Sequence, residues 1–348
     1  MSEPLLSTEG LTRHFRVGKL LSRQTLHAVD DVNFTIGRGE IVALVGESGS
    51  GKSTIARLLA RVYKPTRGEI YSEGKPLSRI RSRRRRLAYS SDVPMVFQDP
   101  YSSINPAYRI AHGIARALKL HRRGLGRDGR RQETQRVLQE VGLVPAGAAT
   151  RKFPYELSGG QRQRVGFAQA LAFRPKLIIA DEPVSMLDVS IRIGVLNLMS
   201  ELREREGVSF LYITHDVASA RYIADRVLVM YGGHLVEEGP TEEIIQRPKH
   251  PYTQLLLSAV PDPRAPLGLA DITDAGEPPK VVDPKEGCRF RQRCPYAVAR
   301  CETETPLLRE LGRRRQVACH VAEADPEDLV SGNGLESDRP RAASLEQP

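Results

Sequence analysis

The sequence predicts an α/β fold with a mainly parallel sheet, and three apolar runs carry that prediction. Residues 41–45 read Ile-Val-Ala-Leu-Val, and residues 176–180 and 208–214 are mostly apolar. Such continuous runs suit strands that are buried on both faces of a parallel sheet. Segments with helical character separate these runs along the chain, and alternation of strands and helices is typical of this fold class.

Other elements extend this core. Residues 5–15 and 25–36 read as strands joined by turns, and they end at Gly37-Arg-Gly39. The charged stretch from about residue 100 to residue 170 has helical character and predicts an inserted helical subdomain. Helices are expected at residues 53–61, 110–118 and 132–140.

The composition sets the domain organisation. At about 150 residues per domain, a chain of 348 residues predicts two domains. Residues 1–262 form the first, and residues 263–322, rich in Pro and charge, form a small separate module with all four cysteines. Residues 323–348 are rich in Asp, Glu, Pro and Ser, which predicts a disordered tail.

The chain also lacks the features of a membrane-spanning or secreted protein. No run reaches the roughly 18 apolar residues of a membrane span, and no signal peptide opens the sequence. We therefore expect a cytoplasmic protein that meets a membrane only through a partner. The net charge is +10, and the densest basic run is Arg81-Ser-Arg-Arg-Arg-Arg86. This run has no interleaved aromatic residues on which bases could stack. Two interpretations of the run remain: a solvated face, or a surface that contacts acidic lipid headgroups or a partner.

A glycine-rich loop follows the first buried run. Gly46-Glu-Ser-Gly-Ser-Gly51-Lys52-Ser53 matches the phosphate-loop pattern and lies between a predicted strand and a predicted helix. Lys52 can reach the β- and γ-phosphates, and the Ser53 hydroxyl can bind Mg²⁺. The expected ATP-binding residues of this loop are Gly46, Ser48, Gly49, Gly51, Lys52, Ser53 and Thr54.

Two carboxylates end the second buried run. Asp181 stands at the carboxyl end of the predicted strand, where it can contact Mg²⁺ directly or through water. Glu182 points differently and is the candidate general base for the attacking water. Together with the phosphate loop, this pair predicts hydrolysis of a nucleoside triphosphate.

The string Leu157-Ser158-Gly159-Gly160-Gln161 identifies a family. With it, residues 5–260 resemble an ATP-binding cassette (ABC) ATPase. The resemblance implies a phosphate-loop core with a parallel sheet, an antiparallel β subdomain and an inserted helical subdomain. It also implies that Ser158, Gly159, Gly160 and Gln161 contact the ATP bound to a second subunit.

Further site residues follow from this resemblance. Gln98 matches the glutamine that senses Mg²⁺ and water, and His215 matches the histidine that contacts the γ-phosphate. Asp188 matches the loop that communicates across the dimer, although Met186 stands where many members carry a small residue. Phe15 is the candidate for stacking on adenine, with His14 as the alternative.

A narrower resemblance concerns the transported cargo. His250-Pro-Tyr-Thr253 and Phe97-Gln-Asp-Pro-Tyr101-Ser-Ser-Ile-Asn-Pro106 are similar to segments of oligopeptide, dipeptide and nickel importers. The chain looks closer to the second ATPase of such pairs. This implies a heterodimer on the cytoplasmic face, two membrane permeases and, indirectly, an external substrate-binding protein. Tyr101 and Asn105 are the expected permease contacts.

Two alternatives remain open. The chain can serve a nickel or sugar importer of the same group, because other subunits choose the cargo. It can also be a non-transport ABC ATPase that acts on nucleic acid, which the basic charge mildly favours. Against this, no second cassette, long coiled coil or close pair of zinc-binding cysteines is visible in the sequence.

Cys288, Cys294, Cys301 and Cys319 lack the close C-x2-C pairs of zinc fingers. Spacing alone leaves zinc, an iron–sulfur cluster and free thiols open. The resemblance to peptide-importer ATPases implies a structural [4Fe–4S] cluster held by these four thiolates, with His320 as a substitute ligand. Its loss is expected to loosen the C-terminal module and to spare ATP binding.

Overall fold

The computed structural model contains two sheets. It describes residues 3–18, 24–99, 104–122, 124–258, 281–312 and 314–323. The smaller sheet is antiparallel, with the strand order β2-β1-β4-β5. Its strands are β1 (Leu6–Val17), β2 (Gln24–Ile36), β4 (Arg67–Ser72) and β5 (Lys75–Pro76). The predicted antiparallel β subdomain is therefore confirmed.

The larger sheet forms the core of the molecule. Its strands are β3 (Ile41–Val45), β6 (Met95–Val96), β7 (Leu177–Asp181), β8 (Ser209–Thr214), β9 (Arg226–Tyr231), β10 (His234–Pro240), β11 (Arg309–Glu310) and β12 (Gln316–Val317). They lie in the order β11-β12-β10-β9-β3-β8-β7-β6, and the five strands from β9 to β6 are parallel. Every residue of β3, β7 and β8 is buried, as the apolar runs predicted.

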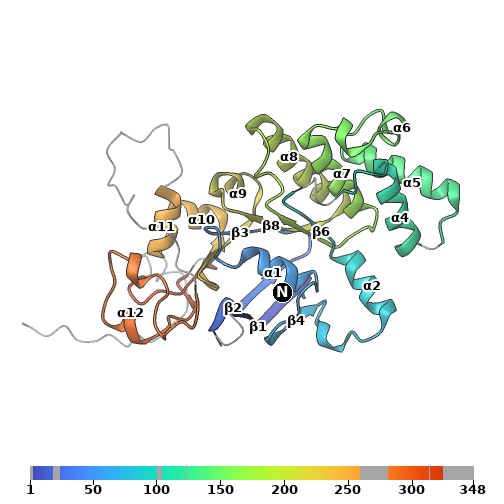
Figure 1. Ribbon diagram of the computed structural model, residues 1–348. Coiled ribbons are helices and arrows are strands. Elements are labelled where there is room, and N and C mark those ends of the chain that lie inside the picture. The colour runs from blue at the N-terminus through green and yellow to red at the C-terminus, as the bar shows by residue number, and fades with distance from the viewer. Residues whose placement is uncertain are drawn as a thin grey trace, which may run out of the picture.

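Helices cover both faces of this sheet. Helix α1 (Lys52–Leu59) lies between the two sheets, where Ile55, Leu58 and Leu59 are fully buried. Helices α8 (Val189–Glu206), α9 (Val217–Ile223) and α10 (Thr241–Gln246) pack on the opposite face. This layering brings the carboxyl ends of β3, β6, β7 and β8 to one edge, beside the start of α1 (Figure 1).

The helical subdomain is inserted between β6 and β7. It comprises α4 (Ile110–His121), α5 (Arg127–Glu140), α6 (Ala146–Ala149) and α7 (Gly159–Leu171). Helix α5 begins five residues before the predicted start, because its polar first turns carry no apolar periodicity that sequence patterning can detect. Ile114, Leu118, Val137 and Leu138 form its fully buried interior. The predicted insertion is confirmed.

The C-terminal region is joined to the core sheet. Helix α11 (Pro251–Ser258) precedes a segment outside the described residues, and α12 (Arg300–Thr303) is followed by the short strands β11 and β12. Strand β12 pairs antiparallel with β10, through Glu237↔Val317 and Glu238↔Gln316. The four cysteines therefore belong to a region that extends the ATPase sheet at one edge (Figure 1). The predicted tail falls outside the described residues, apart from Glu323.

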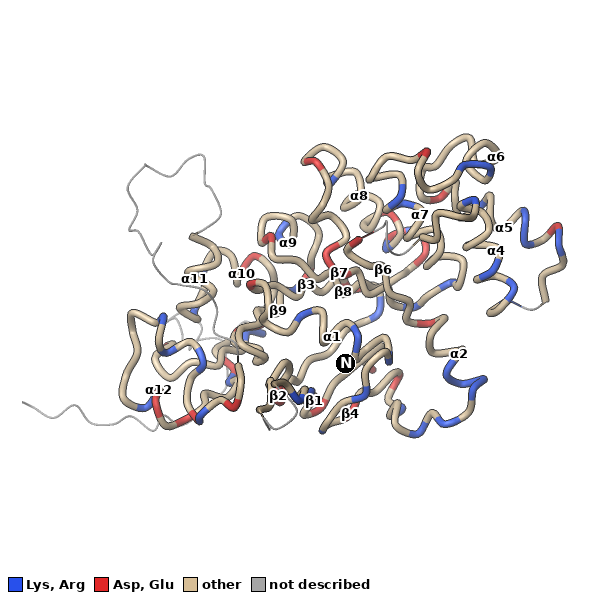
Figure 2. The backbone as a smooth tube through the Cα atoms, viewed as in Figure 1, with Lys and Arg blue, Asp and Glu red and all other residues tan. Residues whose placement is uncertain are grey.

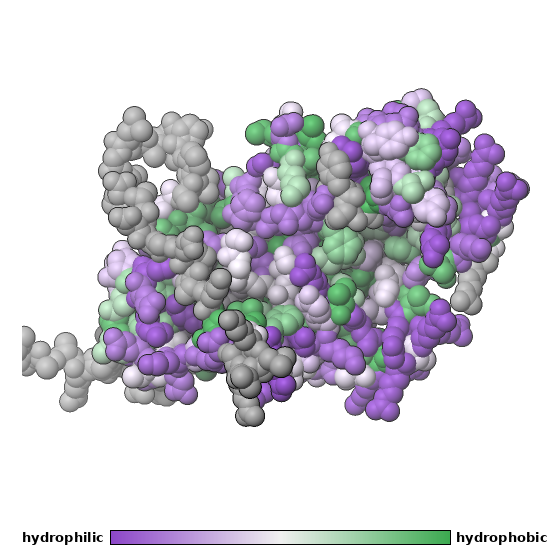
Figure 3. All heavy atoms as spheres, in the orientation of Figure 1, coloured by the Kyte–Doolittle hydropathy of each residue, from purple (hydrophilic) through white to green (hydrophobic). Residues whose placement is uncertain are grey.

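The basic run lies on a separate surface helix. Helix α2 (Arg83–Asp92) begins after Ser82, whose side chain accepts a hydrogen bond from the Arg85 backbone. Arg83, Arg84, Arg85 and Arg86 are exposed. Figure 2 shows basic residues on α2 and near the turn between α4 and α5, and Figure 3 shows hydrophilic surface there. Among the described helices, none combines the length and apolar character that a membrane span needs.

Candidate nucleotide-binding site

The phosphate loop connects β3 to α1, as the sequence predicted. Gly51 has φ 111°, and a Cβ atom there would lie 2.2 Å from the Ala28 carbonyl oxygen. Gly46 has φ 155°, and a Cβ atom there would lie 2.2 Å from the Met230 carbonyl oxygen. The loop is therefore packed tightly between β2 and β9. Both positions require glycine, because of their positive φ and because a Cβ atom would collide with a backbone carbonyl.

Lys52 is folded into this loop. Its Nζ atom donates to the carbonyl oxygens of Gly46 and Glu47, each at 2.7 Å, and the residue is 5% exposed. Burial lowers the pKa of Lys52, although the carboxylates of Glu182 and Asp181 oppose this. An ammonium group placed inside a loop of backbone amides can exchange carbonyl oxygens for phosphate oxygens.

Asp181 lies beside the start of α1. The Ser53 hydroxyl donates to Asp181 Oδ1 at 3.1 Å, which joins two of the three candidate Mg²⁺ ligands across β7 and α1. Asp181 is 6% exposed, and burial raises its pKa. A buried carboxylate gains stabilisation when a cation arrives, because the cation compensates for the lost solvation.

Glu182 meets the other two candidate catalytic side chains. Its Oε2 atom lies 2.9 Å from Gln98 Nε2 and 3.3 Å from His215 Nδ1. Glu182 adopts φ 46°, a left-handed conformation that turns its side chain away from the direction of β7. The structure therefore brings Gln98, Glu182 and His215 together from the ends of three neighbouring strands.

The Ser-Gly-Gly-Gln string caps a helix at a different place. Ser158 is the N-cap of α7, its hydroxyl accepts from the Gln161 backbone at 3.3 Å, and Gln161 Oε1 accepts from the Ser158 backbone at 3.2 Å. A Cβ atom on Gly160 would lie 2.3 Å from Ile191, which follows Asp188 on α8. The string and the Asp188 loop are thus packed together, with Ser158 and Asp188 exposed and Gly160 buried. In the described part of the chain, neither makes a hydrogen bond to the phosphate loop.

The two adenine-stacking candidates differ in their surroundings. Phe15 is half-buried and packs edge-on against Tyr63, with the Arg13 guanidinium 4.5 Å above its ring. His14 stacks on His27 at 3.7 Å and lies 3.2 Å from an Asp30 oxygen. Each ring therefore has a neighbour over one face, His27 over His14 and Arg13 over Phe15, and this geometry does not separate the two candidates.

Three residues at the phosphate loop were not anticipated from the sequence. Glu47, the second residue of the loop, forms an ion pair with Arg293 of the C-terminal region, and its backbone N–H donates to the Tyr252 hydroxyl. Tyr252 lies within the family-like segment His250–Thr253, and Arg293 directly precedes Cys294. Neither position in the sequence indicates that its side chain contacts the phosphate loop.

The four cysteines lie close together. The Cys288 backbone donates to the Cys301 carbonyl at 2.8 Å, Cys301 and Cys319 are buried, and no disulfide forms. Burial, with smaller contributions from the neighbouring thiols, raises the pKa of Cys288 to about 11 and also raises those of Cys294 and Cys319. No three of these sulfurs lie within 4.8 Å of one another, although all four cysteines are described.

The fold and this site define the class: the protein is an ABC-type ATPase. The model of the ABC transporter family matches residues 29–185, and that of the oligopeptide/dipeptide transporter C-terminal region matches residues 236–301. A probable peptide ABC transporter ATP-binding protein of Sinorhizobium fredii is 41% identical, covering 97% of this chain and 95% of its own length. The di/tripeptide transport ATP-binding protein DppF of Pseudomonas aeruginosa is 42% identical over 92% of this chain and 98% of its own. The chain belongs to the ATP-binding subunits of peptide ABC transporters.

Solved structures agree with the fold. CbiO1 of Clostridium perfringens, described as part of an ABC transporter complex, has a TM-score of 0.61 and 26% identity, covering 71% of this chain and 92% of its own. The cassette MJ0796, described as a dimer in a post-hydrolysis state bound to ADP and Pi, has a TM-score of 0.60 and 27% identity. That match covers 68% of this chain and 98% of MJ0796. The predicted ABC ATPase fold is confirmed.

Proposed function

We propose that the chain hydrolyses ATP to energise the import of oligopeptides or dipeptides through membrane permeases, from the cytoplasmic face of the membrane. The observation that carries this proposal is the convergence of Gln98, Glu182 and His215 beside the linked pair Ser53–Asp181. The peptide cargo is supported by the similarity to the peptide transport proteins of S. fredii and P. aeruginosa.

Each side chain has a proposed task. Lys52 and the loop amides bind the β- and γ-phosphates, while Phe15 stacks on adenine. Ser53, Asp181 and Gln98 would hold Mg²⁺, which would neutralise charge on the phosphates. Glu182 orients the attacking water and accepts its proton, and His215 donates to the γ-phosphate. The contacts of Glu182 Oε2 with Gln98 and His215 already hold the carboxylate in one orientation.

The second half of the reaction site is proposed to come from another subunit. Ser158 and Gly159 expose a helix N-terminus to solvent, which suits a phosphate of a nucleotide bound elsewhere. Asp188 lies beside this surface and is exposed. Since MJ0796 is described as a dimer, we propose a head-to-tail dimer here, with a second, non-identical ATPase as the partner.

Replacement of Glu182 by Gln tests the proposed chemistry. Because an amide cannot accept the proton of water, we expect phosphate release to fall by about 10²–10⁴-fold while ATP binding persists. Glu204→Gln, a change at an exposed position of α8, is the matched control and should hydrolyse ATP at the parental rate. Parental turnover by Glu182→Gln would remove this residue from the mechanism.

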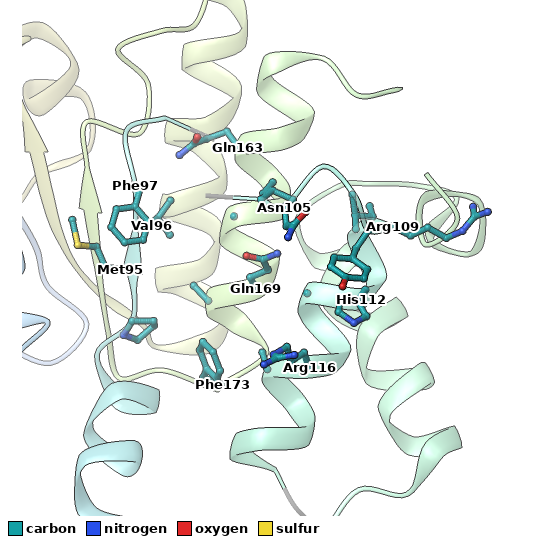
Figure 4. Close-up of a pocket in the computed structure, with 18 residues that line it drawn as sticks. Met95, Val96, Phe97, Asn105, Arg109, His112, Arg116, Gln163, Gln169 and Phe173 are labelled. Carbon is teal, nitrogen blue, oxygen red and sulfur yellow. The ribbon is translucent and has the colours of Figure 1, made fainter. Parts of the chain in front are cut away.

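A groove beside Gln98 is the proposed permease site. A cavity of about 380 Å³ opens between β6 and the helical subdomain, lined by Met95, Phe97, Asn105 and Gln169 among others (Figure 4). Phe97 and Tyr108 are 46% and 50% exposed. Exposed aromatics around a hollow fit an apolar helix end from a partner. Tyr101, the other expected contact, lies outside the described residues.

Transport assays test this placement. We expect Phe97→Ala to lower peptide uptake several-fold in the assembled transporter, since it removes an exposed ring from the groove, and to leave ATP binding unchanged. Tyr222→Ala removes a 57% exposed aromatic outside the groove and serves as the control. Equal uptake by the two variants would place the permease elsewhere.

We further propose that the cysteines hold a [4Fe–4S] cluster. The four cysteines are neighbours, since the other three thiols contribute to the raised pKa of Cys288. Such a cluster would supply cross-links between Cys288, Cys294, Cys301 and Cys319, and its binding would displace their thiol protons.

Metal analysis tests this part. After anaerobic purification, iron and sulfide in equal amounts, near four of each per chain, are expected. Zinc, or four thiols that react with an alkylating agent, would contradict the cluster. Either result would leave the proposed ATPase function intact.

A further inference from the structure

Glu47 is held from outside the nucleotide core. Arg293, which directly precedes Cys294, donates from Nη1 and Nη2 to the two carboxylate oxygens of Glu47, at 2.8 and 2.9 Å. The Arg293 side chain is 10% exposed and that of Glu47 is 25% exposed. Hydrogen bonding to Glu47 raises the pKa of Arg293. A bidentate ion pair of this kind fixes the orientation of the two side chains as well as the distance between them.

Tyr252 also contacts Glu47, through the backbone N–H of Glu47. The Glu47 N–H donates to the Tyr252 hydroxyl at 2.8 Å, and Tyr252 is 0% exposed. The Tyr252 backbone in turn donates to His250 Nδ1 at 3.0 Å. Buried Glu237 on β10 accepts from the backbones of Lys249 and His250 at 2.9 and 3.0 Å. The start of α11 is therefore fixed to the core sheet, and its tyrosine reaches the phosphate loop.

An aromatic cluster connects the two holding residues. Phe290, two residues after Cys288, lies 5.2 Å from Tyr231 and 5.5 Å from Tyr252, between ring centroids. The Arg293 guanidinium lies 5.7 Å from the Tyr231 centroid and 5.8 Å from that of Phe290. The position of Arg293 thus depends on the cysteine-bearing segment and on β9.

We propose that the C-terminal region positions the phosphate loop for ATP, with Arg293 and Tyr252 as its two positioning residues on Glu47. Phosphate is bound by the backbone amides of this loop, so a displaced Glu47 misaligns the amides that follow it. This inference rests on the proposed ATP binding at the loop, and it assigns a task to the region from Tyr252 to Cys319.

The test measures the dissociation constant of a fluorescent ATP analogue with the full chain. We expect Arg293→Ala to raise this constant about tenfold, within the usual range of coupling between two sites. Arg300→Ala is the matched control, since Arg300 pairs with Glu304 within the same region and does not touch the loop. It should bind the analogue like the parent.

Further variants keep the test independent of folding. Arg293→Lys retains the charge and loses the bidentate geometry, and Tyr252→Phe removes one hydroxyl. Each should weaken binding of the analogue by a smaller factor than Arg293→Ala does. In the double variant Arg293→Ala/Glu47→Gln, the dissociation constant should rise by a smaller factor than the product of the factors measured for the two single variants.

The outcomes separate the two proposals. If the parent binds the analogue and Arg293→Ala, Arg293→Lys and Tyr252→Phe all bind as tightly as Arg300→Ala, the positioning role is overturned while ATP binding stands. If the parent itself does not bind, the proposed function fails, and this inference fails with it.

Cysteine replacement gives a second readout. The sequence alone led us to expect that loss of the cysteine site would spare ATP binding. Because Cys294 follows Arg293 directly, we now expect Cys294→Ser to weaken binding of the analogue several-fold, as loss of Arg293 does. Unchanged affinity in Cys294→Ser, with the thermal unfolding of the region altered, would contradict the positioning role.

Discussion

The nucleotide core and the C-terminal region are held together in different ways. In the core, β3, β7 and β8 are buried at every position and paired along their whole length. In the C-terminal region, β11 and β12 have two residues each and α12 has four. A region with so little regular structure needs other cross-links.

Charged side chains supply some of these links. Arg289 donates to Asp30 on β2 at 2.5 Å, Arg293 pairs with Glu47, and buried Arg315 donates to the Arg247 carbonyl at 2.8 Å. These three contacts end on the small sheet, on the phosphate loop and on the backbone that follows α10.

The largest expected effect is a steric one in the core. Gly51→Ala places a methyl group 2.2 Å from the Ala28 carbonyl oxygen in a backbone of φ 111°. We expect it to lower the free energy of unfolding by more than about 3 kcal/mol and to abolish ATP binding. Denaturant unfolding without nucleotide measures the first quantity.

Gly49→Ala is the control for this change. Gly49 also has a positive φ, of 79°, but nothing lies within 4 Å of a Cβ atom there. The Gly49→Ala variant should lose only about 1–2 kcal/mol of the free energy of unfolding, from the strain of the left-handed conformation. If both variants lose equal stability, the contact with β2 does not restrict this loop.

Lowering the pH is expected to have an intermediate effect on the free energy of unfolding, through a buried histidine at the junction of the two regions. His250 is 1% exposed, and burial lowers its pKa from 6.5 to about 3. Between these values the unfolded chain binds a proton that the folded chain does not, so stability falls as the pH drops below about 6.5. From pH 7 to pH 5, this residue should lower the free energy of unfolding by about 2 kcal/mol.

Comparison with a variant isolates this contribution. His250→Asn has no titrating ring, so the difference in its free energy of unfolding between pH 7 and pH 5 should be smaller than that of the parent. His112→Asn, at an exposed position, should retain the parental difference. An unchanged pH dependence in His250→Asn would show that this buried ring is not the acid-sensitive group.

The smallest effect is expected at the surface of the C-terminal region. Arg300 and Glu304 form an ion pair at 2.7 Å with side chains that are 62% and 54% exposed. Because solvent screens such pairs, Arg300→Ala should change the free energy of unfolding by less than about 0.5 kcal/mol. A loss of more than about 1 kcal/mol would show that even exposed pairs hold this region.

The sequence by itself determined the class of fold and the nucleotide motif. The apolar runs at β3, β7 and β8, the glycines of the phosphate loop, and the carboxylates after β7 are local patterns, because burial and backbone conformation restrict each position directly. The order of these patterns predicted an α/β fold with a phosphate loop, and the family resemblance carried by Leu157–Gln161 then implied the ABC ATPase fold. The same local information predicted the helical insertion, although it missed the polar start of α5.

Only the tertiary structure decided which distant residues meet. The contact of Glu182 with Gln98 and His215 depends on the order of β6, β7 and β8 in the sheet, which no local pattern specifies. The contacts of Glu47 with Tyr252 and Arg293 join positions more than 200 residues apart. Ion pairs and single hydrogen bonds leave no periodic trace in a sequence, so the link between the C-terminal region and the phosphate loop could not be predicted from it.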